Sequence, residues 1–271
     1  MDQTPRNHLP TLAAIGALAY VIAVALHEHL GHAAACIALG SRPDELGAFY
    51  IQCHDAGLSS LGIRGVAIAG PVASLLLGII AFALLPKKPE RAEGWLFVWL
   101  LGTLGLMTGT GYMMFSGIVG IGDLGVGDDA ALHGLDHAGI YRIVLAVIGG
   151  ATYYASARYA VKRIEPFVPG AGNARVAAGR KLFMVIYVTG ALVYLAIGAL
   201  NPYGLLIVVT SSMASSLGGT SGFLWMMETA DRKSPANTEP PLVVRARPGW
   251  IVAAIALCGL YSATFGPTIR P

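Results

Sequence analysis

Long apolar stretches constrain the fold of this 271-residue chain more than any other feature of its sequence. A helix that crosses a bilayer needs about 20 largely apolar residues. Only 12% of the residues are charged, well below the share of about 25% in soluble domains. We therefore expect an all-α protein, a single integral membrane domain over residues 1–271. The sequence predicts a polytopic bundle of about seven transmembrane helices, at 10–39, 62–85, 95–118, 138–160, 182–200, 203–227 and 249–267.

The distribution of lysine and arginine predicts the orientation of this bundle. With seven crossings, fourteen of the 18 basic residues, Lys88 and Lys233 among them, fall on the side of the amino terminus. Cytoplasmic loops carry such an excess. We expect a multi-pass protein of the inner (plasma) membrane, with a cytoplasmic amino terminus and a carboxyl terminus in the periplasm or outside. The polar loop 229–248 is expected to be a flexible cytoplasmic connection.

The segment from Leu26 to His32, LHEHLGH, places four ionisable side chains inside the first predicted helix. A charge at the centre of a transmembrane helix costs at least about 2.5 kcal/mol on insertion scales. Three imidazoles and a carboxylate are also the groups that bind zinc and related ions. A coordinated cation would therefore compensate for this cost.

Helical geometry restricts which of these side chains can act together. At about 100° per residue, Glu28 lies about 40° and His29 about 60° from His32, whereas His27 lies about 140° away. A regular helix would therefore group Glu28, His29 and His32. A π-bulge adds one residue to a turn and would bring His27 toward His32, and Gly31 would ease that distortion. The spacing leaves both arrangements open.

Three short motifs resemble those of the site-2 protease family of intramembrane zinc metalloproteases. The pattern His27-Glu28…Gly31-His32 is similar to the HExGH helix of that family, with one extra residue between the histidines. The segment AGPVAS at 69–74 is similar to the family's AGPxxN, with serine in place of asparagine. The FSG…GDL residues of 115–124 are similar to the segment in which the family carries an aspartate that binds zinc.

This resemblance covers roughly residues 20–130, and its HExLGH variant is also similar to uncharacterised bacterial membrane proteins. It implies that His27, His32 and Asp123 bind zinc and that Glu28 is the general base, which takes a proton from zinc-bound water. His29 is the alternative ligand, favoured if the helix is regular. The implied activity is that of a metalloprotease-like hydrolase.

Two other classes of function fit the same residues. Histidines in helices also bind haem or copper, so the chain is alternatively a non-catalytic metal- or cofactor-binding protein, or an accessory subunit of a larger membrane complex. A transporter is a third reading. Beyond the lipid bilayer, the expected partners are a membrane-protein substrate or partner subunits. The net charge of +3 gives no reason to expect nucleic acid.

Smaller features leave further alternatives. Cys36 and Cys53 fall on the same predicted outer side and can form a disulfide there, unless Cys36 is buried within its helix. His133 and His137 are spaced for a second metal pair, or else belong to a solvated loop. The serine- and glycine-rich residues 211–222 either line the site or allow close helix packing.

Overall fold

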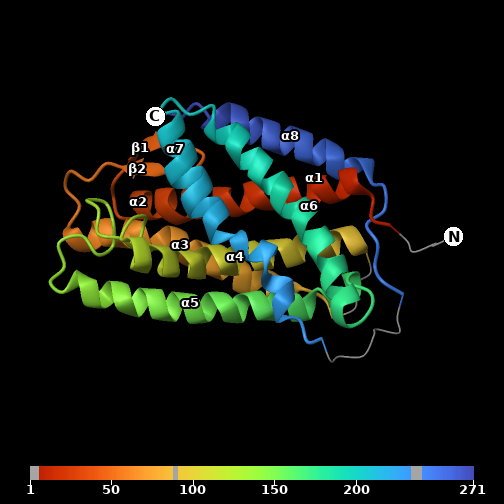
Figure 1. Ribbon diagram of the computed structural model, residues 1–271. Coiled ribbons are helices and arrows are strands. Elements are labelled where there is room, and N and C mark those ends of the chain that lie inside the picture. Colours follow the sequence, from red (N-terminus) through yellow and green to blue (C-terminus); the bar gives the residue numbers. More distant parts are fainter. Residues whose placement is uncertain (1–5, 88–90, 233–239) are drawn as a thin grey trace.

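Long helices make up most of the structure, which is a computed structural model (Figure 1). It describes residues 6–87, 91–232 and 240–271, without the side chains of 207 and 213–216. Six helical segments are long and apolar enough to cross a membrane. This confirms the expected all-α helical bundle. The first segment, Leu9–Ala38, is continuous and comprises α1 (Leu9–Ala25), the π-helical segment η1 (Leu26–Ala33) and α2 (Ala34–Ala38). The others are α3 (Ser60–Leu84), α4 (Ala92–Val119), α5 (Ala138–Arg163), α6 (Gly172–Gly198) and α8 (Pro248–Phe265).

The stretch 203–227 does not form the regular seventh helix that its length predicts. It is divided into short pieces: α7 (Leu205–Ile207), the π-helical segment η3 (Val208–Leu217) and two 3-10 turns, Ser221–Leu224 and Met226–Thr229. Serine and glycine in its middle weaken the helix, because serine side chains compete for backbone hydrogen bonds and glycine has high backbone freedom. The segment packs against α6, where Ser212 donates a hydrogen bond to the carbonyl of Tyr194.

Helix α4 lies at the centre of the bundle, between α3 and α5, while α1 packs against α4, α6 and α8. Large aromatic side chains fill the middle: Trp99 of α4 and Phe183 of α6 stack with ring centroids 5.6 Å apart, and both are fully buried. Glycines allow α3 and α4 to approach closely. A Cβ atom on Gly105 would lie 2.5 Å from the backbone nitrogen of Gly78, so this crossing requires glycine.

The outer faces of α5 and α8 carry exposed apolar side chains, including Ile143, Val147 and Ile255. Each of these three side chains is more than 60% exposed. Contiguous apolar surface of this extent would cause a water-soluble protein to associate. On a bundle of spanning-length helices such a surface is suited to contact with lipid.

One end of the bundle carries a β-hairpin and the carboxyl terminus (Figure 1). Strands β1 (Pro43–Leu46) and β2 (Ile51–Cys53) pair antiparallel, and Leu46 also bridges to Ile269 near the end of the chain. A disulfide between Cys36 and Cys53 ties β2 to α2. The hairpin is therefore held from both sides, by the disulfide and by the carboxyl-terminal segment.

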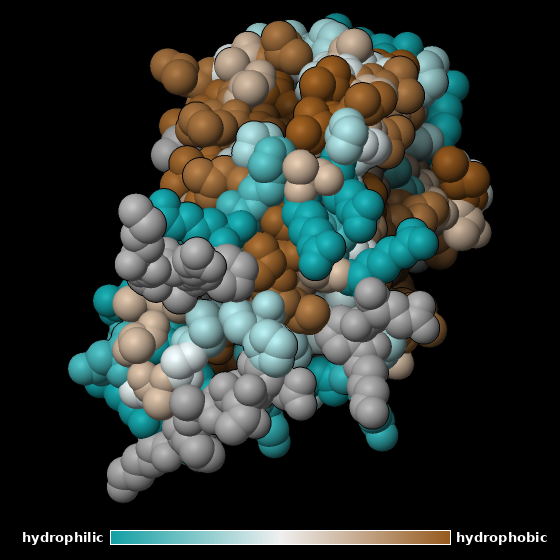
Figure 2. All heavy atoms as spheres, turned by 90° about the vertical axis from the view of Figure 1, so that its right-hand side faces the viewer, coloured by the Kyte–Doolittle hydropathy of each residue, from teal (hydrophilic) through white to brown (hydrophobic). Residues whose placement is uncertain are grey.

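The opposite end carries the start of α1 and a band of hydrophilic side chains across its middle (Figure 2). The part of the predicted loop 229–248 that follows residue 239 is anchored there: His8 donates a backbone hydrogen bond to Val244, and Arg245 donates one to the buried carboxylate of Glu93. Lys88 and residues 233–239, with Lys233, lie outside the described residues.

Candidate metal centre

The π-helical segment η1 brings His27 and His32 onto one face of the first helix. Widening the helix to i→i+5 hydrogen bonds accommodates the extra residue of the motif. Of the two arrangements that the sequence leaves open, the structure has the π-helical one. His27, Glu28 and His32 are buried, with exposed fractions of 2%, 3% and 7%.

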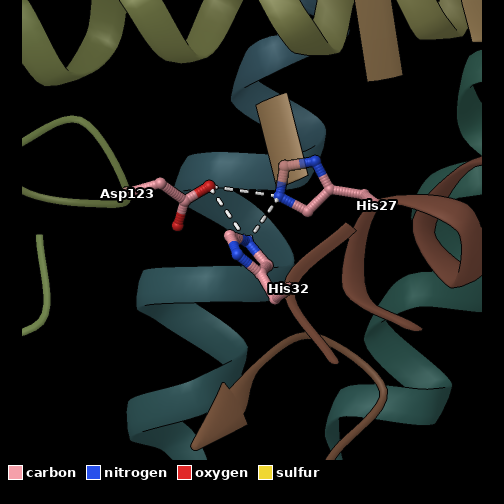
Figure 3. A group of neighbouring side chains, drawn as sticks. All are labelled: His27, His32 and Asp123. Carbon is pink, nitrogen blue, oxygen red and sulfur yellow. Dashed lines mark hydrogen bonds and ion pairs between the residues drawn. The ribbon is translucent and has the colours of Figure 1, made fainter. Parts of the chain in front are cut away.

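Asp123 completes a compact group with the two histidines (Figure 3). Its Oδ2 lies 3.1 Å from His27 Nε2 and 3.4 Å from His32 Nε2, and the two Nε2 atoms are 3.3 Å apart. The three side chains point toward one another, two from η1 and one from the loop after α4. This is the only group of three or more potential ligands found within the described part of the chain.

The separations fit a small divalent ion. Ligands about 2.0–2.1 Å from a tetrahedral ion such as zinc are roughly 3.3 Å from one another. The three measured distances are close to this value. Two imidazole nitrogens and one carboxylate oxygen therefore stand at three corners of a suitable tetrahedron, and the group can hold a metal ion.

Neighbouring groups orient both imidazoles through their Nδ1 atoms. His32 Nδ1 donates a hydrogen bond to the backbone carbonyl of Val66 at 2.8 Å, so its Nε2 presents a lone pair to the group. His27 Nδ1 lies 2.9 Å from the hydroxyl of Ser74, and the His27 ring stacks on Tyr112 with centroids 4.8 Å apart. Partners of this kind fix the ring orientation of metal-binding histidines.

The resulting arrangement directs electron-rich atoms at one another in a buried space. With hydrogen on both Nδ1 atoms, two nitrogen lone pairs and a carboxylate oxygen meet within 3.4 Å. A shared cation, either a proton or a metal ion, relieves this repulsion. When the shared cation is a proton on the imidazoles, burial alone would raise the pKa of Asp123, but the positive charge and the hydrogen bonds of His32 and His27 outweigh burial and hold this pKa below its ordinary value.

A compact loop holds Asp123 in place. Gly120 ends α4 with a positive φ of 84°, and the carbonyl of Asp123 accepts a hydrogen bond from the backbone of Ala131 at 2.8 Å. Leu124 is buried against Ala67 of α3. The apolar residue after the aspartate thus anchors the loop and turns the carboxylate toward η1.

Gly31 and Gly70 make room for the centre. A Cβ atom on Gly31 would lie 2.6 Å from the Cα atom of Gly70, so η1 and α3 touch through their backbones. A Cβ atom on Gly70 would lie 2.2 Å from His32 Nε2 and 2.7 Å from His27 Nε2. The glycines of the HEHLGH and AGPVAS segments therefore pack against each other beneath the imidazoles.

Glu28 lies on the wall of a cavity of about 180 Å³ together with His32 and Asp123. The hairpin, the start of α3, the Asp123 loop and Ser211 of η3 complete its lining. Within the described residues, the Glu28 carboxylate has no hydrogen bond or ion pair with another side chain. It is thus free to bind a molecule that enters the cavity beside the metal centre.

The other candidate ligands lie apart from this group. His29 packs its ring against Phe265 at 4.1 Å and against Tyr261, both on α8. His133 is exposed, and its Nδ1 lies 3.6 Å from Asp128 Oδ1. His137 is the N-cap residue before α5 and has a φ of 59°. The structure therefore does not bring His29 to the metal centre and gives His133 the surroundings of a solvated loop.

Tyr112 and Val66 belong to the centre although the sequence analysis did not select them. Tyr112 stacks on His27, and Val66 supplies only a backbone carbonyl. A carbonyl leaves no signal in a sequence, since every residue has one. An aromatic residue within a long apolar stretch is equally uninformative until its neighbours are known. Of the serine- and glycine-rich residues 211–222, Ser211 lines the cavity, and Gly222 packs against Met107.

The fold and the site together define a class of protein: a bundle of apolar helices of membrane-spanning length, with a buried His–His–Asp group that can hold a metal ion. Comparison of the chain with protein-family models, with curated proteins and with solved structures gave no match. The resemblance to site-2 proteases therefore rests on the motifs of the sequence alone.

Proposed function

We propose that this protein is a metal-dependent hydrolase of the membrane that cleaves a peptide bond, with zinc held by His27, His32 and Asp123. The observation that carries the proposal is the position of Glu28. This carboxylate follows a ligand directly in the chain, lines the same cavity as the other two ligands and has no partner of its own among the described residues. A non-catalytic metal site has no need for an unpaired buried carboxylate.

Each residue of the site has a separate task in this proposal. A divalent ion supplies Lewis acidity, which lowers the pKa of a coordinated water and polarises a carbonyl. Glu28 accepts the proton of the attacking water and passes it to the leaving amine. Ser74 and the carbonyl of Val66 keep the two imidazoles oriented, and Tyr112 covers the face of His27.

We further propose that the chain crosses the inner membrane seven times, with the irregular stretch 203–227 as one of the crossings. The hairpin and the carboxyl terminus then face the periplasm or outside, and the amino terminus faces the cytoplasm. Two observations support this. The described termini lie at opposite ends of the bundle, and the Cys36–Cys53 disulfide is at the end assigned to an oxidising compartment (Figure 1).

Metal content and cleavage together test the proposal. Purified protein is expected to contain one equivalent of zinc by elemental analysis. His32→Ala should lose that zinc, whereas Glu28→Gln should keep it and no longer cleave synthetic transmembrane peptides, followed by mass spectrometry. His29→Ala is the matched control, since it removes an imidazole from the same segment but outside the group. It should keep both zinc and activity.

Two results would contradict parts of this proposal. Glu28→Gln with full cleavage would show that this carboxylate is not the base. A protein that binds zinc through His32 but cleaves no peptide would instead be the alternative, a non-catalytic metal-binding membrane protein or an accessory subunit. A haem or copper absorption band would support that second class as well.

A further inference from the structure

The wall of the catalytic cavity carries four carboxylates. They belong to Glu28, Asp123, Asp55 and Asp129. Within the described residues, no lysine or arginine lines this cavity. A divalent ion at the metal centre would balance two of these charges, so an excess of negative charge remains. Glu28 is 3% exposed and without a hydrogen-bond partner among the described residues, so it adds an unpaired polar group in the buried part of the cavity.

Asp55 and Asp129 differ from Asp44 and Glu45, two other acidic residues at this end of the bundle. Asp44 pairs with His54 at 2.8 Å, and Glu45 pairs with Arg270 at 2.9 Å. In the part of the chain that the structure describes, Asp55 and Asp129 form no ion pair. They come from two different loops, one before α3 and one before α5, and both reach the same cavity.

The remaining lining is apolar and aromatic. Its apolar members include Phe49, Ile51, Leu58 and Ile63, and Tyr50 and Tyr112 add aromatic rings. Lysine and arginine match this combination, because their aliphatic stems pack on apolar surface while their charged ends seek carboxylates or aromatic faces. The volume of about 180 Å³ slightly exceeds the roughly 150 Å³ of a cavity that holds benzene. It therefore has room for one large side chain.

We propose that the cavity selects peptide segments that carry lysine or arginine beside the bond to be cleaved, and that Asp55 and Asp129 are the residues that recognise this charge. The inference names the substrate class of the proposed hydrolase and rests on that function only for the cleavage step. Recognition itself is a binding event. A field of one sign in a cavity with low-dielectric walls attracts a ligand of the opposite sign.

Binding of labelled peptides tests the recognition step without any cleavage. The probes are fluorescent ten-residue apolar peptides, identical except for a central Lys-Lys, Gln-Gln or Glu-Glu pair. Fluorescence anisotropy is measured with zinc-loaded protein in a non-ionic detergent. The Lys-Lys peptide should bind most tightly and the Glu-Glu peptide least. Each of Asp55→Asn and Asp129→Asn should weaken Lys-Lys binding by about two- to fivefold. The double variant should bind Lys-Lys and Gln-Gln peptides almost equally.

Asp128→Asn is the matched control. It removes the same charge from the same loop, but Asp128 is not part of the lining and its side chain is 98% exposed. It should leave the peptide preference unchanged. Zinc content, measured in parallel, should be equal in all variants, which separates peptide recognition from attraction of the metal ion.

The outcomes of the two proposals are distinguishable. If the Lys-Lys peptide is preferred through Asp55 and Asp129 but no peptide is cleaved, the recognition stands and the hydrolase fails. If peptides are cleaved without preference, the hydrolase stands and the recognition fails. Undetectable Lys-Lys binding, a preference that survives in the double variant, or an equal loss in Asp128→Asn would each overturn the inference.

Discussion

His27 and His32 face each other with their Nε2 atoms 3.3 Å apart. Five positions separate them, and a regular α-helix would turn them about 140° away from each other. The π-helical geometry of Leu26–Ala33 instead places both histidines on the same face of the helix. Contact with α3 stabilises this geometry. The metal centre therefore depends on a local helix geometry that packing has to stabilise.

Gly31→Ala should separate η1 from α3. The added Cβ atom would lie 2.6 Å from the Cα atom of Gly70, and backbone cannot move aside as a side chain can. We expect a loss of about 1–3 kcal/mol in the free energy of unfolding, together with loss of bound zinc. Thermal unfolding and elemental analysis check both effects. Gly259→Ala on α8 meets nothing within 4 Å and should be neutral. Full zinc content in Gly31→Ala would show that the close contact is not required.

Ser74→Ala should weaken metal binding without unfolding the protein. The hydroxyl of Ser74 lies 2.9 Å from His27 Nδ1, and loss of such an outer partner typically costs 10- to 100-fold in metal affinity. Competition with a zinc chelator measures the change. Ser116→Ala is the control, because Ser116 is a buried serine whose hydroxyl has no partner within the described residues. An equal effect of both variants would mean that Ser74 does not orient His27.

Reduction of the Cys36–Cys53 disulfide should destabilise the hairpin above the cavity. The bond closes a loop with a sequence separation of 17, for which loop entropy predicts a stabilisation of about 3 kcal/mol. We expect a lower unfolding temperature after reduction or in Cys36→Ser/Cys53→Ser. Mass spectrometry after alkylation should find only Cys258 modified in the unreduced, unfolded protein. Three alkylated cysteines without reductant would contradict the disulfide.

Glu45 should make stability depend on acid pH. Burial alone would raise the pKa of Glu45, but hydrogen bonds from Arg270, Tyr50 and Tyr203 outweigh it and hold this pKa below its ordinary value. The ionised carboxylate therefore stabilises the folded state at pH above the unfolded-state pKa of about 4.3. That contribution disappears as the pH falls through the lower, folded-state pKa.

Glu45→Gln tests this dependence. The variant should lose about 1–2 kcal/mol at pH 7 and show a flatter decline in unfolding temperature below about pH 4.3 than the wild type. Asp44→Asn is the control, since Asp44 lies on the same strand as Glu45 but its side chain is more exposed, at 39% against 9%. If the unfolding temperatures of the wild type and of Glu45→Gln decline in parallel as the pH falls, Glu45 is not the cause of the acid dependence.

The sequence alone determined the class of fold and most members of the site. Lipid offers no hydrogen-bond partner to backbone N–H and C=O groups, so an apolar stretch of spanning length has to form a helix. This conclusion does not require knowledge of which other segments pack against the stretch. Ionisable residues inside such a stretch are costly, so LHEHLGH drew attention to His27, Glu28, His29 and His32, and it left open which histidines belong to the site. The stretch 203–227 met the length criterion too, but serine and glycine in its middle broke the helix.

Tertiary structure decided which histidine faces Asp123 and which faces away. His27 and His29 differ by two positions, and only the π-helical form places His27 in the centre and His29 against Phe265 of α8. That form is stabilised by backbone contact between Gly31 and Gly70, residues that are far apart in sequence. Tertiary structure also brings Asp55 and Asp129 to one cavity. It places the Val66 carbonyl where it accepts the hydrogen bond from His32. The spacing of two residues determines the angle between their side chains in a regular helix. Contacts between helices determine whether the segment forms an α-helix or a π-helix.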